Sequence, residues 1–285
     1  MAKRPAFQFK YYFLGALFLV SFFVWYAVLA ETRSGLKVAF LDVGQGDAIF
    51  IEAPNGNQVL IDGGPNKSVL RELSKQMPFY DRTIDAIILT HPHLDHYGGF
   101  VEALDNYKIN LEMDSGNNNP GLSGFDIYIK KLAENKVRRI LAKRGTRVTL
   151  DKGIYLDILF PVTNKEGFSP HDEMVVARLV YGNSSFLLTG DMEDNLENYL
   201  LSLGGSLKSD VLKVGHHGSK TSTSESFLGW VNPGLAVISV GQGNKYGHPH
   251  KEVTDRLVRF GIPTLRTDEK GTIVLKSDGE KVVVK

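Results

Sequence analysis

Apolar and polar positions divide the chain into one long apolar stretch near the N-terminus and a longer region of short apolar runs. These runs are bounded by Gly, Asn, Asp and Pro, a pattern typical of β-strands separated by turns and helices. The predicted strands are residues 36–41, 48–52, 58–61, 84–89, 139–141, 147–150, 154–160, 174–180, 185–189, 211–214 and 236–240. The predicted helices are 68–76, 125–135 and 253–260, with a further helix beginning near residue 98. The pattern predicts one large domain, residues 36–285, after an N-terminal segment and linker, residues 1–35.

The composition supports a single domain with a core and excludes some kinds of site. Of the 285 residues, 42% are hydrophobic and 10% are aromatic, which is enough for one large buried core. The formal net charge of +1 gives no overall basic field of the kind that favours nucleic-acid binding. Cysteine is absent, so disulfides and thiolate metal sites are excluded.

The apolar stretch that starts at Tyr11 and ends at Ala30 contains no charged side chain. As a helix it is long enough to cross a hydrocarbon core of about 30 Å. Aromatic side chains flank it, and Lys and Arg side chains precede it, as is typical of a membrane span whose N-terminus lies inside. We expect a single-pass anchor in the cell membrane with residues 36–285 outside. A cleaved signal peptide that releases a secreted domain is the alternative.

Three imidazoles and a carboxylate follow the apolar run 84–89 within six residues. They are His91, His93, Asp95 and His96. Neutral imidazole and carboxylate are ligands that zinc and manganese accept, and His91 and His93 share one side of an extended backbone. The motif therefore predicts a metal site at the end of a strand, with a His-rich surface loop as the alternative.

Two later strands also end in Gly followed by a potential ligand. Asp191 follows the strand 185–189 and a Gly, and a carboxylate there could bridge two cations about 3.5–4 Å apart. A turn or helix-capping Asp is the alternative. His216 is the first side chain after the strand 211–214 and a Gly, so we expect it to be the last ligand of a second metal. Adjacent side chains of an extended backbone point to opposite faces, so His217 should support a ligand or contact the substrate.

The His-x-His-x-Asp-His motif after a buried strand resembles the signature of the metallo-β-lactamase superfamily. Other segments resemble one branch of it, the metallo-hydrolase domain of ComEC, a bacterial DNA-uptake channel protein, and its free-standing relatives. These segments are residues 40–48, 212–219, 237–241, 244–250 and 267–273. The resemblance implies an α+β fold of the αββα type, in which outer helices sandwich two sheets, and cleavage of phosphodiester bonds in DNA. The chain has one hydrophobic segment in place of a many-helix channel, so we do not expect transport.

The resemblance also implies two divalent metal ions, zinc or manganese, and residues to hold them. The expected ligands are His91, His93 and His171 for one ion, and Asp95, His96 and His216 for the other, with Asp191 between the ions. At His171 the alternatives are Asp172 as the ligand, or an exposed loop position. Many ComEC relatives have an Asn-rich stretch here that this chain lacks, which leaves the occupancy of the first metal site open. Asp62, after the strand 58–61, is expected to fix the tautomer and angle of a metal-bound imidazole, or to be a plain turn residue.

Catalytic and substrate-binding roles complete the hypothesis. Asp95 is expected to orient the nucleophile, and a protonated His248 is expected to neutralise charge that develops on the transferring group. The alternative for His248 is a ring that satisfies a loop backbone group. Lys213 and Lys220 bracket the adjacent histidines, and with Ser219 they are expected to contact phosphate.

We therefore expect a metal-dependent hydrolase, in the first place a phosphodiesterase or nuclease that acts on DNA outside the cytoplasmic membrane through a metal-activated hydroxide. Hydrolysis of a small ester, thioester or lactam is the alternative, because the same ions polarise a carbonyl group. A membrane-tethered binding module with a decayed site is a third hypothesis. The sequence leaves the metal, the strandedness of the substrate and the oligomeric state open.

Overall fold

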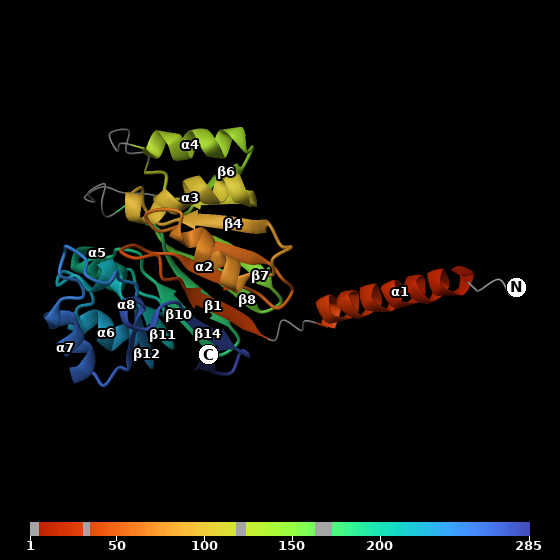
Figure 1. Ribbon diagram of the computed structural model, residues 1–285. Coiled ribbons are helices and arrows are strands. Elements are labelled where there is room, and N and C mark those ends of the chain that lie inside the picture. Colours follow the sequence, from red (N-terminus) through yellow and green to blue (C-terminus); the bar gives the residue numbers. More distant parts are fainter. Residues whose placement is uncertain (1–5, 31–34, 118–123, 163–172) are drawn as a thin grey trace, which may run out of the picture. The chain divides into compact units, whose positions relative to one another are not determined.

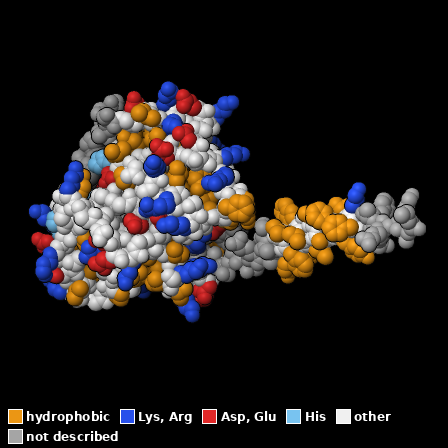
Figure 2. Space-filling model, in the orientation of Figure 1, with side chains coloured by type: hydrophobic (Ala, Val, Ile, Leu, Met, Phe, Trp, Pro, Cys, Tyr) orange, Lys and Arg blue, Asp and Glu red, His pale blue; other side chains and the backbone are white. Residues whose placement is uncertain are grey.

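The computed structural model describes residues 6–30, 35–117, 124–162 and 173–285, and the chain divides into two compact units, Met1–Ser34 and Gly35–Lys285. In the first unit, the helix α1 (Ala6–Ala30) carries the apolar stretch. Its segment Phe9–Tyr26 has the length and composition of a membrane span, and hydrophobic side chains cover the face seen in Figure 2. A signal sequence near an N-terminus can have the same length and composition.

Within the described residues, the second unit contains two β-sheets, and neighbouring strands in each order are hydrogen-bonded to one another. The first sheet is β15 (Val282–Val284), β14 (Ile273–Ser277), β1 (Leu36–Phe40), β2 (Ile49–Glu52), β3 (Gln58–Ile61), β4 (Thr83–Leu89), β5 (Lys108–Asp114) and β6 (Arg138–Leu141). The second sheet is β13 (Thr264–Arg266), β12 (Leu235–Ile238), β11 (Val211–Lys213), β10 (Ser184–Leu188), β9 (Val176–Tyr181), β8 (Ile154–Phe160) and β7 (Arg147–Asp151).

Side chains that alternate across each sheet build a core in layers. Between the sheets, Val38 and Phe40 of β1 belong to one buried cluster with Phe186 of β10. Phe50 of β2 and Leu60 of β3 face the other way, into a second cluster with the helices that cover the first sheet. Those helices are α2 (Ser68–Gln76), α3 (Leu94–Asn106) and α4 (Phe125–Glu134) (Figure 1). The second sheet is covered by α5 (Asp194–Ser202), α6 (Glu225–Val231) and α7 (Lys251–Arg259). The expected α+β sandwich is thereby confirmed.

Loops at one edge of the sandwich carry the predicted site residues. The strands β3 to β6 run parallel to one another, as do β10 to β12, so each set has its carboxyl ends at one edge. Antiparallel pairing through β2 gives β1 the direction of β3. We call the edge where Leu89 and Leu188 end β4 and β10 the histidine edge. The opposite edge, where Leu36 and Thr83 begin β1 and β4, is the linker edge.

The observed elements agree closely with several of the predicted ones. The helix 68–76 and the strands 58–61 and 154–160 have the predicted bounds. The third helix is different, because α3 begins at Leu94 rather than near residue 98, so Asp95 and His96 lie in its first turn. The elements additional to the predicted set include the strands β5, β13, β14 and β15 and the helices α5, α6 and α8 (Thr267–Lys270).

Candidate metal centre

The His-rich loop between β4 and α3 is held by its own backbone. The N–H of His93 donates to His91 O at 2.9 Å, and His93 O accepts the N–H groups of His96 and Tyr97 at 2.9 and 3.0 Å. Because α3 starts inside the motif, His96 projects from the first helical turn and His91 from the loop before it. The loop and the helix start therefore supply ligands to one place, the histidine edge.

One group of potential ligands consists of His91, His93 and Asp191, whose ligand atoms lie within 4.8 Å of one another. His91 Nε2 lies 2.9 Å from His93 Nδ1 and 3.8 Å from Asp191 Oδ2. The third imidazole expected in this group, His171, and its alternative, Asp172, lie outside the described residues. Two imidazoles and a carboxylate are thus together at the position predicted for a first ion.

A second group consists of Asp95, His96, Asp191 and His217. His96 Nε2 lies 3.2 Å from Asp191 Oδ2. His217 Nε2 lies 3.4 Å from Asp191 Oδ1 and 3.4 Å from Asp95 Oδ2. A tetrahedral ion with bonds of about 2.1 Å needs ligand atoms about 3.4 Å apart, so these separations fit one divalent ion. Asp191 belongs to both groups and links them.

Hydrogen bonds define which ring nitrogen of each buried histidine is available. Asp62 accepts from the Thr90 N–H at 2.8 Å and from the Thr90 hydroxyl at 2.7 Å, and Asp62 Oδ2 lies 2.8 Å from His96 Nδ1. His217 Nδ1 lies 2.9 Å from the carbonyl oxygen of Ser239. A carboxylate and a carbonyl oxygen accept, so in the neutral rings Nδ1 carries the proton and Nε2 carries the lone pair.

The atoms that face the centre of the second group have no hydrogen-bond partners. His96 Nε2, His217 Nε2 and Asp191 Oδ1 are buried and unpartnered. Such atoms are costly to bury, and a cation between them would compensate. Without an ion, burial would lower the pKa of His217, but Asp191 and Asp47 outweigh burial and raise this pKa to about 10. The donor atoms and their geometry fit a divalent ion, which must displace the ring proton when it binds.

The adjacent histidines both approach Asp191, and His217 lies deeper in the site than the sequence suggests. Both have left-handed backbone conformations, with φ of 46° at His216 and 52° at His217, inside the short helix η1 (Gly215–Gly218). The alternation of an extended strand therefore does not apply. His217 is buried in the second group, whereas His216 lies outside it, with Nδ1 2.9 Å from Glu193 Oε1. The Nε2 atom of His216 lies 3.8 Å from Asp191 Oδ2, so His216 stays a predicted ligand, and the geometry adds His217, expected only as a support, to the candidate ligands.

The three predicted phosphate contacts differ in exposure. Lys213 is fully buried, where its Nζ donates to Gly190 O at 2.9 Å and pairs with Asp47. It cannot reach a substrate in solution, so its predicted role is corrected to a structural one. Ser219 is also buried, with its hydroxyl bonded inside its own loop. Lys220 has an exposed side chain and stays a predicted phosphate contact.

His248 lies beside the adjacent histidines, with its ring centroid 5.6 Å from that of His216 and 6.3 Å from that of His217. Asn244 fixes this loop, because its side chain bonds the backbone N–H and the carbonyl oxygen of His248 at 3.0 and 2.7 Å. Burial, followed by the charges of His217 and His216, lowers the pKa of His248 to about 4. This direction, which holds without an ion, favours the neutral ring over the protonated imidazole expected of His248.

The sequence profile of the metallo-beta-lactamase superfamily matches residues 41–242, which is most of the chain and includes both ligand groups. The chain belongs to this superfamily. Zinc-bound PqqB from Methylobacterium extorquens is similar in fold, with a TM-score of 0.57 at 11% identity over 85% of this chain and 100% of that chain. The fold expected from the sequence is therefore found in a solved structure.

Competence proteins are among the curated relatives of this chain. ComE operon protein 3 of Bacillus subtilis (strain 168) is 34% identical over 262 residues, which cover 83% of this chain and 32% of that protein. Competence protein ComA of Neisseria gonorrhoeae is 30% identical over 260 residues, which cover 90% and 35%. The chain thus spans about a third of the length of these relatives. The resemblance to the competence branch is confirmed.

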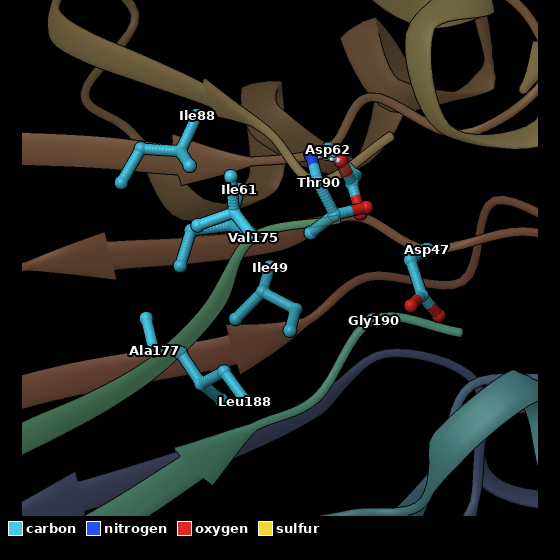
Figure 3. A pocket seen from close by; sticks show the side chains of 10 residues that line it. All are labelled: Asp47, Ile49, Ile61, Asp62, Ile88, Thr90, Val175, Ala177, Leu188 and Gly190. Atoms are coloured by element: carbon cyan, nitrogen blue, oxygen red, sulfur yellow. Dashed lines mark hydrogen bonds between the residues drawn. The ribbon is translucent and has the colours of Figure 1, made fainter. Parts of the chain in front are cut away.

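Two residues that the sequence did not single out, Asp47 and Thr90, contact His217 and Asp62. Asp47 Oδ1 lies 3.4 Å from His217 Nδ1, and Thr90 holds Asp62. A cavity of about 10 Å³ lies nearby. Asp47, Asp62 and Thr90 line it on one side and apolar side chains of both sheets on the other (Figure 3). The cavity has room for one water at most. Asp47 lies in a Gly-rich segment, but its role depends on partners far along the chain.

Proposed function

We propose that this protein is a metal-dependent phosphodiesterase that cleaves DNA. The observation that carries the proposal is the pair of ligand groups that share Asp191. Two neighbouring cations suit phosphoryl transfer, because they stabilise the attacking and the leaving oxygen together. The competence proteins among the relatives support DNA as the substrate. The proposal thus adds a bond type and a substrate to the hydrolase class of the family.

The two groups would hold the ions through atoms that the fold already positions. One ion would be held by His91, His93 and Asp191, and the other by Asp95, His96, Asp191 and His217. When bound, divalent ions supply positive charge that lowers the pKa of water and stabilises charge on a transferring phosphoryl group. Asp62 keeps His96 in the tautomer whose Nε2 faces the ion, and the Ser239 carbonyl does the same for His217.

The ligand Asp95 and two further side chains, His248 and Lys220, have positions suited to the reaction. The Asp95 side chain is 32% exposed, against 3% or less for the other members of the second group, so its carboxylate can orient a water that enters from solvent. The neutral ring of His248 can donate a hydrogen bond to a phosphate oxygen without carrying a charge of its own. Lys220 supplies an exposed positive charge, and its backbone N–H donates to His250 Nδ1 at 3.0 Å, where the His250 ring lies against that of His248.

The nuclease proposal is tested on the full chain, purified in detergent and treated with a chelator. We expect cleavage of single- or double-stranded DNA only after zinc or manganese is added, and loss of cleavage in Asp95→Asn. Asp85→Asn is a matched control, because Asp85 caps the N–H of Gln58 near the linker edge. Hydrolysis of an ester or a chromogenic lactam without DNA cleavage would support the alternative hydrolase. Retention of less than one ion per chain would support a binding module.

We also propose that α1 anchors the protein in the cell membrane, with the domain outside. Positive side chains before the apolar stretch favour an N-terminus inside. Because the chain has no cysteine, Ala2→Cys and Lys285→Cys each create one labelling site. An impermeant maleimide added to cells should label the variant at residue 285 and not the variant at residue 2. A mature protein that begins after residue 30 would support the secreted alternative.

A further inference from the structure

The loop that joins α2 to β4 presents two aromatic side chains at the linker edge. The N–H of Asp81 donates to Pro78 O at 3.0 Å, which closes a tight turn with Phe79 and Tyr80 at its tip. Phe79 is 87% exposed, more than any other large hydrophobic side chain in the described part of the domain, and Tyr80 is 49% exposed. Adjacent exposed aromatic rings indicate a surface that meets an apolar partner.

Hydrogen bonds fix this turn to the sheet. The Asp81 carboxylate accepts from Gln58 Nε2 at 2.8 Å and from the Thr83 N–H at 3.1 Å. Just before the turn, Gln76 O accepts from Lys37 Nζ at 2.7 Å. The two rings also pack edge to face, with centroids 5.5 Å apart. The aromatic tip is therefore a rigid feature beside the first residues of β1.

The chain connects this edge to α1 by a short path. Residues 31–35 separate Ala30, at the end of α1, from Leu36, at the start of β1. Fully extended, this connection reaches about 20 Å. With Ala30 at the surface of a bilayer, Leu36 lies within that distance of the lipid. Arg82 and Lys108 are exposed beside the aromatic turn, with the Lys108 N–H bonded to Arg82 O at 2.8 Å, and they match anionic headgroups in charge.

We propose that the linker edge of the domain rests on the bilayer that holds α1, with Phe79 and Tyr80 among the lipid headgroups. The proposal rests on the anchor proposed above. Aromatic side chains favour the interface between the lipid headgroups and water, because the ring leaves water while the Tyr hydroxyl stays in contact with water. The strand β1 leads away from the linker edge for five residues, or about 16 Å. The histidine edge then faces away from the membrane and takes its substrate from the aqueous side.

Single fluorescent labels on the full chain test this orientation, because there is no native cysteine. Phe79→Cys and Tyr80→Cys carry an environment-sensitive dye in vesicles of phosphatidylcholine and phosphatidylglycerol that contain nitroxide-labelled lipid. Ile127→Cys is the matched control, since Ile127 is 51% exposed and lies on α4 near Tyr97 and Leu94, at the histidine edge. Ser21→Cys, inside α1, reports on the anchor itself.

We expect blue-shifted emission and several-fold stronger quenching at residues 79 and 80 than at residue 127. Strong quenching at residue 21 with equal quenching at residues 79 and 127 would overturn the docking and leave the anchor intact. An unquenched label at residue 21 would overturn the anchor and the docking together. None of these readouts depends on nuclease activity.

Discussion

Lys213 and Asp47 form an ion pair in which the side chains are 0% and 1% exposed. The pair connects three parts of the site. Lys213 Nζ also donates to the carbonyl oxygen of Gly190, the residue before Asp191, at 2.9 Å. Asp47 Oδ1 lies 3.4 Å from His217 Nδ1. Burial would raise the pKa of Asp47, but Lys213 and His217 outweigh burial and lower it to about 2. Asp47 therefore stays ionised next to the candidate ligand His217.

Breaking this pair should destabilise the protein strongly. Lys213→Met leaves the buried Asp47 carboxylate without its cation, which should reduce the free energy of unfolding by about 3–5 kcal/mol. Adding Asp47→Asn to Lys213→Met should recover much of the loss, because no buried charge is left alone. Urea denaturation with chelator present measures the free energy of unfolding of the single and the double variant without any contribution from bound metal.

The control for this prediction is a pair at the surface. Lys251 pairs with Asp255 one helical turn away, and their side chains are 82% and 54% exposed. Lys251→Met should therefore change the free energy of unfolding by about 0.5 kcal/mol or less. An equal loss in Lys213→Met and Lys251→Met would show that the buried pair does not stabilise the fold.

The roles of the adjacent histidines can be separated by metal binding. His217→Ala removes a ring nitrogen that faces Asp95 and Asp191. Loss of a residue that only supports a ligand lowers metal affinity by up to about 100-fold, so the affinity for the second ion should fall further than that in His217→Ala. His216→Ala should cost about 10-fold or less, since Nδ1 of this ring bonds Glu193 and its Nε2 lies 3.8 Å from Asp191 Oδ2, farther than the 3.4 Å of His217. Titration of chelator-treated protein with manganese, followed by electron paramagnetic resonance, counts the ions. A larger loss in His216→Ala would restore the assignment made from the sequence.

Much of the fold follows from local pattern, and its exceptions have physical causes. The strand 58–61 and the helix 68–76 are bounded by turn residues and have the predicted limits. The helix α3 starts earlier than predicted because Gly98 and Gly99, which usually interrupt helices, allow close packing at this position. The strand β5 has exposed polar residues at alternate positions near its start, so it lacks a continuous apolar run. In both cases tertiary packing overrides the local signal.

The site was less predictable, because its details depend on contacts between distant segments. The ligands of the His-rich motif are readable, since their types and spacing are local. The choice between His216 and His217 depends on a left-handed turn that residue type alone does not reveal. The burial of Lys213 depends on Asp47, which lies far away in the sequence and has no local link to it. A lysine beside a ligand loop therefore looks like a phosphate contact until the fold is known.

Gly99 should be intolerant of any side chain. A Cβ at Gly99 would lie 1.9 Å from Gly63 O, and the Gly99 N–H already donates to Gly64 O at 2.8 Å. Gly99→Ala must shift the first turns of α3, so we expect a loss of about 1–3 kcal/mol in the free energy of unfolding. It should also weaken metal binding, because Asp95 and His96 lie in the same helix start.

The matched control is a helical glycine with open space around it. Gly229 lies in α6, and no atom lies within 4 Å of the position of an added Cβ. Gly229→Ala should therefore stabilise the protein by up to about 1 kcal/mol, through helix propensity alone. Thermal unfolding and manganese titration of both variants provide the comparison. Equal melting temperatures for Gly99→Ala and Gly229→Ala would show that the backbone around Gly99 accommodates a Cβ without loss of stability.

The stability of the domain should fall between mildly acidic and mildly basic pH because of Glu112. This side chain is buried, accepts from the Tyr128 hydroxyl at 3.2 Å and from Arg139 Nε at 3.1 Å, and lies near Asp114. Burial and the charge of Asp114 raise the pKa of Glu112 from 4.5 to about 8. The folded protein therefore holds a proton that the unfolded chain releases above pH 4.5.

The sign of this effect gives a direct test. A raised pKa contributes stability that is complete below pH 4.5 and is lost as the pH rises through about 8, with a slope of up to about 1.4 kcal/mol per pH unit. Glu112→Gln keeps the neutral form, so its free energy of unfolding should decline less between about pH 5 and about pH 8. Glu72→Gln is the opposite case, because cationic partners lower the pKa of Glu72 against the effect of burial. Urea denaturation across this range should thus give a shallower decline for Glu112→Gln than for the natural chain, and identical slopes would contradict a protonated Glu112.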